Sequence, residues 1–161
     1  MEPIKWRILE EDEDKYFVVA DLILDMGAFG QSNDWANSDI RAWLNEEFLT
    51  KAFDEYQSLI INKNQNTTYY WEWQGDEMQQ RSTTEKVFLL SYNEIIKSEY
   101  GFGDSQERAG YVSDYAKALG VWTGAGELND PPNPSWQIHT GMYFLRSGAL
   151  HYKQGRADSL R

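Results

Sequence analysis

The chain has 161 residues, no cysteine and a formal net charge of −11. Its length suits a single domain over 1–161 with a polar tail at 151–161, and the lack of cysteine excludes disulfides, thiolate metal sites and thiol nucleophiles. The negative charge, with no cluster of lysine and arginine, argues against nucleic-acid binding. No apolar run approaches the length of a membrane helix and no apolar leader opens the chain, so we expect a cytoplasmic protein that does not bind membranes.

Two short β-like runs open the sequence, at 4–9 and 15–20, and the acidic run EEDED lies between them. Their alternation predicts a hairpin whose buried face carries four apolar side chains, Trp6, Ile8, Phe17 and Val19. A calcium loop over Glu10–Asp14 is the alternative, but the run lacks the glycine and the ligand spacing of such loops. We therefore expect a solvated turn at this position.

The stretch NSDIRAWLNEEF, at 37–48, predicts a helix. Ser38 is the expected N-cap, because its hydroxyl can accept hydrogen bonds from the free N–H groups of the first turn. Apolar residues recur at helical spacing and should form the buried face: Ile40, Trp43, Leu44 and Phe48. Arg41 lies off that face, so we expect it to anchor a loop or a carboxylate rather than a substrate. A second helical stretch with its own apolar residues is expected at about 50–61.

Residues 62–84 are polar and carry the aromatic cluster YYWEW, which favours a long loop or an irregular hairpin. Loops of this length are uncommon unless they have a function. The apolar run KVFLL, at 86–90, predicts a central strand. Ser91 and Glu94 then have the spacing of a capping box, which predicts a helix through about Glu99 that ends at the following glycines.

The last third of the sequence begins with a helix that Ser113 should cap and Gly120 should end. A loop rich in glycine, asparagine and proline follows at 122–138, and MYFLRS, at 142–147, predicts a final strand. The sequence therefore predicts an α+β protein with a small, mostly antiparallel sheet and several short helices.

Several separate motifs occur in a fixed order: IKWRILE, SDIRAWLNEEF, EKVFLLS, SDYAKALG and MYFLRS. Over about residues 3–148 the chain resembles a bacterial family of unknown function, common in Firmicutes. Its members show W-R-V-L-E, S-x-[IL]-R-x-W-L-N, D-K-V-F-L-L-S, T-x-Y-A-K and W-W-L-R-S-P-G motifs. The resemblance implies a C-type-lectin-like fold. Family members continue past the last motif, whereas this chain has Gly148 in place of proline and then stops, so we expect a fold that is incomplete at its C-terminus.

The resemblance assigns no catalytic residue, so function has to be inferred from composition. Aromatic residues make up 15% of the chain, and several tryptophans lie in segments that lack core periodicity. We therefore predict a non-catalytic domain, without cofactor or metal, that recognises an unknown protein or carbohydrate ligand. The expected contact residues lie in two loops, at 66–76 and 122–138: Trp71, Trp73, Trp122 and Trp136.

Two other classes of function remain open. A carbohydrate-active hydrolase would use a carboxylate pair such as Glu72 and Asp76, although nearby pairs are expected by chance among 26 acidic residues. An interaction subunit would use an open sheet edge at the incomplete C-terminus to recruit a second chain, including a second copy of itself. The two histidines, His139 and His151, have no sequence context typical of a catalytic triad.

Overall fold

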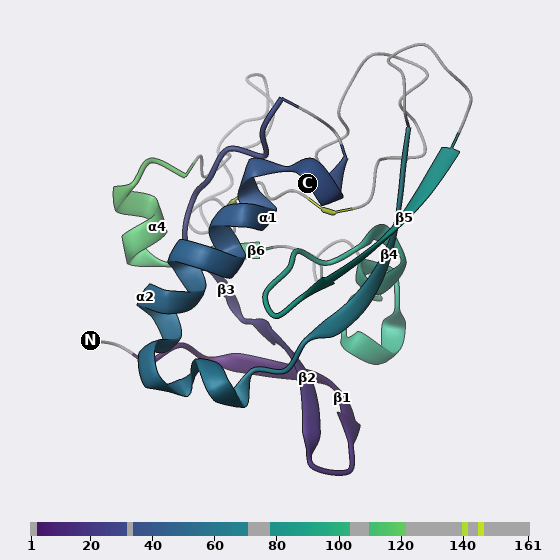
Figure 1. Ribbon diagram of the computed structural model, residues 1–161. Coiled ribbons are helices and arrows are strands. Elements are labelled where there is room, and N and C mark those ends of the chain that lie inside the picture. Colours follow the sequence, from purple (N-terminus) through teal and green to yellow (C-terminus); the bar gives the residue numbers. More distant parts are fainter. Residues whose placement is uncertain are drawn as a thin grey trace. The chain divides into compact units, whose positions relative to one another are not determined.

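The computed structural model of the chain describes residues 3–31, 34–70, 78–103, 110–121, 140–141 and 145–146 (Figure 1). These residues group into two compact units. The first unit contains the described residues up to Met26 and those from Asn93 to Gly141. The second contains the described residues from Gly27 to Tyr92, together with Leu145 and Arg146. Each unit is described by itself, and a single domain over 1–161 stays a prediction.

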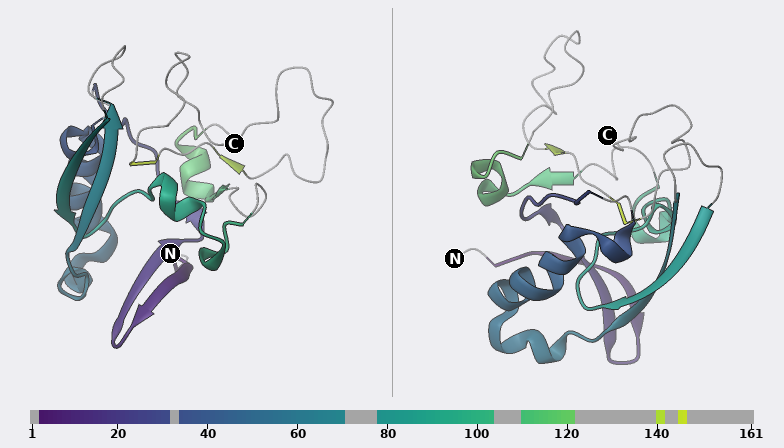
Figure 2. Two further views of the ribbon diagram at one scale, coloured as in Figure 1. Left: turned by 90° about the vertical axis from the view of Figure 1, so that its right-hand side faces the viewer. Right: turned by 45° about the horizontal axis from the view of Figure 1, so that its top comes forward.

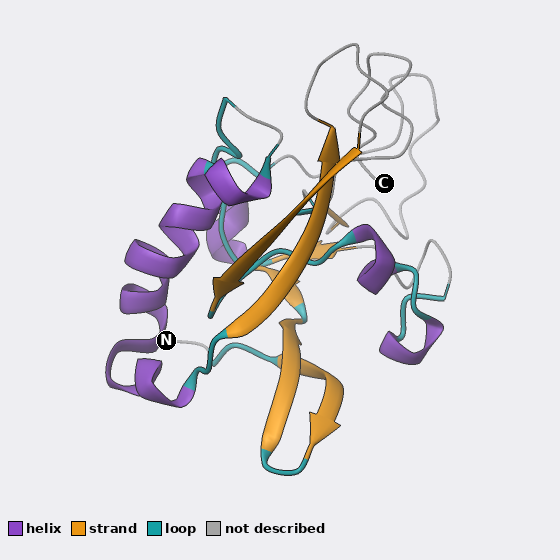
Figure 3. Cartoon of the chain, turned by 45° about the vertical axis from the view of Figure 1, so that its right-hand side comes forward, coloured by secondary structure: helices purple, strands orange, loops and turns teal. Residues whose placement is uncertain are grey.

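The first unit opens with the predicted hairpin. Strands β1 (Trp6–Asp12) and β2 (Lys15–Ala20) pair antiparallel, and Glu13 takes the left-handed conformation that the tight turn requires, with φ of 52°. The acidic run thus extends strand β1 and forms the turn, as Figure 3 shows at the end of this long two-stranded element. The prediction of a hairpin with a solvated acidic turn is confirmed.

The predicted buried face of this hairpin is wrong for β1. Trp6 is 39% exposed and Ile8 is 58% exposed, whereas Leu9 is buried. The register between β1 and β2 shifts between Ile8 and Glu10, which is the signature of a β-bulge. A bulge adds one residue to one strand, so the alternation that is read from the sequence changes face at that point.

The rest of the first unit consists of short elements. Strand β3 (Leu22–Ile23) pairs parallel with β6 (Gly110–Val112), and β6 pairs antiparallel with β7 (Thr140–Gly141). The predicted helix after Ser91 is shorter than expected: α3 (Tyr92–Ile95) is one turn long, and a separate 3₁₀ turn, η4 (Ser98–Tyr100), follows it. Gly101, with φ of 74°, ends η4 as predicted.

Helix α4 (Asp114–Ala118) confirms both of its predicted ends. The hydroxyl of Ser113 accepts a hydrogen bond from the N–H of Ala116 at 3.1 Å. At the other end Gly120 has φ of 94° and donates to Lys117 O at 3.0 Å, while Val121 donates to Ala116 O at 3.1 Å. These two bonds form a Schellman motif, and glycine fits its left-handed position without steric cost.

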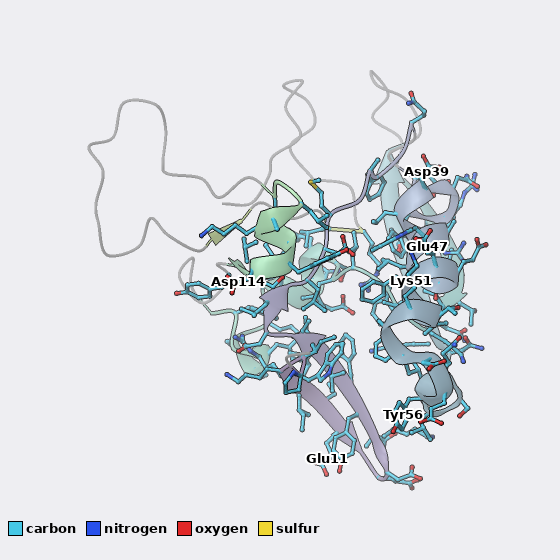
Figure 4. The ribbon with its side chains drawn as sticks, turned by 90° about the vertical axis from the view of Figure 1, so that its left-hand side faces the viewer. Glu11, Asp39, Glu47, Lys51, Tyr56 and Asp114 are labelled. Carbon is cyan, nitrogen blue, oxygen red and sulfur yellow. The ribbon has the colours of Figure 1, made fainter. Side chains whose placement is uncertain are left out.

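In the second unit the two predicted helical stretches are present as a series of helical segments, which we call the helical run. The run consists of η1 (Trp35–Asn37), α1 (Asp39–Trp43), the π-helical turn η2 (Leu44–Phe48), α2 (Leu49–Phe53) and η3 (Asp54–Leu59). The extended backbone of Ser38 separates its first segment from its second. Ser38 caps α1 by accepting from Arg41 N at 3.3 Å. The expected apolar face of the stretch at 50–61 is wrong, because Tyr56 is 61% exposed and Leu59 is 75% exposed. The 3₁₀ period of three breaks the helical stripe there, and Figure 4 shows Tyr56 at this end of the run.

The core of the second unit forms around Trp35, Ile40 and Leu44, which are buried. The predicted apolar face, which α1 and η2 share, therefore covers the core as expected. Partly buried side chains pack against it: Phe29, Trp43, Phe48, Val87, Phe88 and Leu89. The ring of Trp43 lies 5.2 Å from that of Phe48, between centroids, so Trp43 takes part in this packing.

The described part of the polar segment at 62–84 forms a regular two-stranded ribbon. Strands β4 (Lys63–Tyr70) and β5 (Met78–Glu85) pair antiparallel along their whole length, from Lys63–Glu85 to Tyr70–Met78. On the solvent face, cross-strand hydrogen bonds of 2.7 Å join Ser82 to Asn66 and Thr84 to Asn64. Figure 2 shows the helical run beside this ribbon.

The run KVFLL is not the predicted central strand, because β5 ends at Glu85 and residues 86–90 have no strand pairing. Side chains and one distant peptide group bond this segment instead, as described below. Of the predicted strand MYFLRS, Leu145 and Arg146 are described, and neither lies in a strand. The α+β class with small, mostly antiparallel sheets and short helices is confirmed. A C-type-lectin-like topology and an incomplete C-terminus stay predictions.

Candidate functional site

A buried carboxylate ends strand β5 in the second unit. The side chain of Glu85 is 1% exposed. Its Oε1 accepts hydrogen bonds from Trp35 Nε1 at 2.7 Å and from Thr83 Oγ1 at 2.8 Å, and its Oε2 accepts from Arg41 Nε at 3.2 Å. Burying a carboxylate is costly unless it is paired and hydrogen-bonded. These three donors offset the desolvation cost of the buried charge.

Arg41 reaches this carboxylate from the first turn of α1. The hydroxyl of Ser38 fixes the turn, because it accepts from Arg41 N and donates to Trp35 O at 2.9 Å. Nη1 of Arg41 also donates to Ala36 O at 3.3 Å. The guanidinium therefore links η1 to Glu85. The prediction that Arg41 anchors a loop or a carboxylate is confirmed.

Asn45 satisfies the backbone beyond the end of β5. Its Oδ1 accepts from the N–H of Lys86 at 3.0 Å and from that of Val87 at 3.2 Å. Its Nδ2 donates to Val87 O at 2.8 Å and to Arg41 O at 3.0 Å. One side-chain amide thus supplies the partners that a neighbouring strand would otherwise provide. This explains how the run KVFLL can leave the ribbon without orphaned peptide groups at its start.

Arg146 bonds the backbone at the other end of that run. This residue is 3% exposed. Its Nη1 donates to Leu89 O at 2.5 Å and its Nη2 to Gln65 Oε1 at 2.8 Å, and its backbone N–H donates to Leu90 O at 3.1 Å. The guanidinium carbon also lies 5.2 Å from the centre of the Phe88 ring. Arg146 therefore links strand β4 to the segment that follows β5.

A second buried carboxylate caps η1. The side chain of Asp34 is 4% exposed and lies 3.3 Å from Arg81 Nη1. It accepts hydrogen bonds from Ala36 N at 3.0 Å and from Asn37 Nδ2 at 2.6 Å. The bond to Ala36 N is a normal helix N-cap contact. This carboxylate is thus committed to holding the start of the helical run against β5.

Between the helical run and the base of the β4–β5 ribbon the surface is hollowed. The depression has a volume of about 390 Å³. Most of its lining residues are polar or charged, and Ala42 and Leu49 are the apolar ones. The described lining residues are Arg41, Ala42, Asn45, Glu46, Leu49, Asn62, Thr84, Glu85 and Lys86. Glu85 and Asn45 are fixed in it by the hydrogen bonds described above. It is therefore a candidate binding site whose walls are already ordered.

The first unit has a polar cluster of a different kind. The hydroxyl of Tyr100 donates to Glu10 Oε1 and lies 2.9 Å from Lys97 Nζ, which is in turn 3.5 Å from Glu10 Oε1. Burial, followed by the bond to Glu10, raises the pKa of Tyr100, and the bond to Tyr100 raises the pKa of Lys97. These directions favour a neutral phenol and a charged amine. The cluster joins the hairpin strand β1 to η4.

Arg7 makes a second link within the first unit. Its Nη2 bonds Asp21 at 3.2 Å, its Nη1 donates to Gly101 O at 3.4 Å, and its guanidinium carbon lies 5.3 Å from the centre of the Phe102 ring. Lys5 pairs with the same carboxylate at 2.9 Å. The hydrogen bond from Lys5 is the largest cause that lowers the pKa of Asp21. Both polar clusters of the first unit thus hold the β1–β2 hairpin to other elements.

The predicted contact tryptophans and the alternative carboxylate pair fall outside the described residues: Trp71, Trp73, Trp122, Trp136, Glu72 and Asp76. The two histidines fall outside them as well. Sequence reasoning did not single out Glu85, Asn45 or Arg146. A usable signal existed, because Glu85 directly precedes the apolar run KVFLL and Arg146 directly follows the apolar residues of MYFLRS.

The fold and the site define a small α+β protein whose second unit is organised by buried charges that hydrogen-bond within the chain. The chain belongs to the family described as "Domain of unknown function (DUF6273)", whose model matches residues 13–156. No curated protein and no solved structure gives a significant match to it. Within the described ranges, no group of three or more His, Cys, Asp or Glu residues is placed to hold a metal ion, and no helix is long and apolar enough to cross a membrane.

Proposed function

We propose that this chain is a non-catalytic recognition domain whose ligand is a protein or carbohydrate surface. The contact residues that we propose are the four tryptophans of the two segments that lack core periodicity, Trp71, Trp73, Trp122 and Trp136. Tryptophan combines a large apolar area with a polar N–H group, and it is favoured where proteins bind partners. No cofactor is required for such a role.

The β4–β5 ribbon is the observation that carries this proposal. Its register pairs every residue of both strands and ends at Tyr70–Met78, and its base is fixed by the buried bonds of Glu85. Residues 71–77 connect the two strands and carry Trp71 and Trp73 in the sequence. Connections that are carried by a rigid scaffold are the usual place for binding residues. The ribbon therefore supports a role in recognition for this segment.

A non-catalytic role is supported by the way the buried charges of the second unit are used. A general acid or base has to exchange a proton with a bound substrate. Glu85 instead accepts three hydrogen bonds from its own chain, and Asp34 caps a helix. These two carboxylates serve the fold, and the pair that we predict for a hydrolase stays Glu72 and Asp76.

A glycan array with the full chain, followed by a reducing-sugar assay on any glycan that binds, tests the proposal. We expect binding without turnover, weakened about tenfold or more by the double substitution of Trp71→Ala and Trp73→Ala. Trp6→Ala is the matched control, because Trp6 is a partly exposed tryptophan in β1 outside both segments. Turnover that Glu72→Gln abolishes would establish the hydrolase instead.

Two further measurements decide between the remaining outcomes. Thermal unfolding followed by circular dichroism should show nearly unchanged midpoints for the tryptophan variants, and unfolding at room temperature would make these residues core and overturn the proposal. If no glycan binds, sedimentation velocity over a range of concentrations is the next test. Self-association there would favour an interaction subunit that recruits a second copy. A chain that stays monomeric and binds neither a glycan nor a protein would contradict a role in recognition.

A further inference from the structure

The depression of the second unit lies between one stripe of the helical run and the base of the β4–β5 ribbon. The helical side contributes positions 41, 42, 45, 46 and 49, whose spacing places them on one side of a helix. The ribbon side contributes Asn62, which precedes β4, and residues 84–86 at the end of β5. A volume of about 390 Å³ is in the range of pockets that hold small molecules.

The walls of the depression are held by bonds that do not need a ligand. Glu85 is fixed by Trp35, Thr83 and Arg41, and Asn45 bonds the peptide groups of Lys86. A site that is ordered in advance loses less conformational entropy when a ligand binds. The depression is therefore rigid enough to bind a small polar ligand without a large loss of conformational entropy.

Four charged side chains line the depression, two of each sign. Arg41 and Glu85 lie 3.2 Å apart and compensate each other. Lys86 Nζ donates to Gln57 O at 2.7 Å, which is a neutral acceptor, and the ammonium forms no ion pair with any described residue. Glu46 is exposed and makes no ion pair within the part of the chain that the structure describes. One positive and one negative charge thus remain on the lining.

Hydrogen-bonding groups accompany these two charges. The known bonds of Arg41 use Nε and Nη1, so its Nη2 group makes no hydrogen bond within the described ranges. The same holds for the side-chain amide of Asn62, which can both donate and accept. Guanidinium and ammonium groups bind carboxylates, and a carboxylate binds an ammonium.

A ligand with charges of both signs complements this lining better than the alternatives do. A simple anion would meet the carboxylate of Glu46, and an uncharged sugar would meet two charges that it does not compensate. Among the described residues of the lining there is also no aromatic ring on which a sugar could stack. We propose that the depression binds a small zwitterion of amino-acid or dipeptide size, with its carboxylate toward Lys86 and Arg41 and its ammonium toward Glu46.

This proposed site uses none of the residues of the tryptophan segments, because its described lining residues all lie outside them. Binding can be followed by NMR titration of the full ¹⁵N-labelled chain with the standard L-amino acids and with the dipeptide Ala-Ala. Each probe is compared with its N-acetylated form and with its C-amidated form, which each lack one of the two charges. We expect saturable shifts around Asn45 and Lys86 with at least one free probe, and an affinity about threefold or more lower for each of its capped forms.

Charge-neutralising substitutions locate the binding site. We expect Glu46→Gln and Lys86→Gln each to weaken binding by about three- to tenfold. Glu47→Gln and Lys51→Gln are the matched controls, because they make the same charge changes on the helical run that carries Glu46. These two residues pair with each other at 2.6 Å on its exposed side, outside the lining, and Figure 4 labels both. Their affinities should stay within about twofold of the unmodified chain.

Three outcomes would overturn the proposal. They are the absence of saturable shifts with every free probe at about 10 mM, equal binding of free and capped forms, or wild-type affinity of both Glu46→Gln and Lys86→Gln. Lys86→Gln removes the ammonium that donates to Gln57 O, so its fold has to be checked by thermal unfolding. Glu46→Gln alters an exposed carboxylate, and it carries the test by itself if the lysine variant is unstable.

Discussion

The two units place their ionic side chains at different depths. In the second unit the side chain of Glu85 is 1% exposed and Arg146 is 3% exposed, and each bonds several groups of its own chain. In the first unit Lys97 and Glu10 are about half exposed, with side-chain exposures of 46% and 49%. Removing one partner of a buried pair leaves an unsolvated polar group behind, whereas water replaces a lost partner at the surface. Equivalent substitutions should therefore lower the free energy of unfolding far more in the second unit than in the first.

The largest effect is expected from Glu85→Ala. This change leaves the buried N–H of Trp35 without its acceptor and removes the partner of Arg41. We expect the free energy of unfolding, measured by urea denaturation, to fall by about 3 kcal/mol. Glu47→Ala, which breaks an exposed ion pair, should change it by no more than about 0.5 kcal/mol. Equal losses in the two variants would contradict the difference between buried and exposed charges.

A smaller effect is expected from Arg146→Lys, which keeps the charge and removes the planar guanidinium group with its two forked NH₂ groups. The fork bonds both Leu89 O and Gln65 Oε1, and one ammonium group cannot reproduce this geometry. We expect a loss of about 2 kcal/mol in the free energy of unfolding. The same substitution in the first unit, Arg7→Lys, should cost less than about 1 kcal/mol because its side chain is 39% exposed. A larger loss of stability for Arg7→Lys than for Arg146→Lys would contradict the proposed difference between the two units.

Local signals in the sequence were sufficient for the parts of the fold that depend on neighbouring residues. Ser38 and Ser113 cap their helices as predicted, because a cap involves only the next three residues. The acidic turn of the β1–β2 hairpin and the buried face of α1 are also confirmed. In each case the interaction that decides the structure lies within one turn or one strand pair.

The remaining features depend on partners that are distant in the sequence. The β4–β5 ribbon is polar on both faces, with Gln65 and Thr67 buried and Asn64 and Asn66 exposed, so no alternation of apolar residues marks it as regular. The apolar run KVFLL resembles a strand, but the side chain of Asn45, 42 residues from Val87, satisfies its first peptide groups. No periodicity could have indicated such a partner.

The same limit applied to the candidate site. Arg41 was expected to anchor a loop or a carboxylate, and the sequence could not say which of the 26 acidic residues would be its partner. Glu85 lies 44 positions away, and its burial becomes apparent only when Trp35 and Arg41 are placed beside it. The depression likewise joins a helix to the ends of two strands. A binding site of this kind is created by packing and has no motif of its own.

The smallest effect is expected from pH and is confined to the first unit. The folded state raises the pKa of Tyr100 above its ordinary value of 10.0, because burial and Glu10 both disfavour the phenolate. Since the unfolded chain then loses this proton at a lower pH than the folded chain does, the stabilisation is complete below pH 10 and is lost as the pH rises through the folded value. Lys97, whose pKa is also raised, acts in the same direction.

Urea denaturation at a series of pH values from neutral to strongly alkaline measures this loss, and Tyr100→Phe is the variant that isolates it. We expect Tyr100→Phe to be less stable than the unmodified chain by about 1 kcal/mol at neutral pH, because it removes the hydrogen bond to Glu10. Above pH 10 the difference should shrink, since the phenol no longer contributes once it ionises. Tyr111→Phe is the matched control, because Tyr111 is 53% exposed in the same unit. A difference for Tyr100→Phe that stays constant with pH would show that the phenol titrates alike in the folded and unfolded chains, and that even the half-exposed charges around it behave as they do in water.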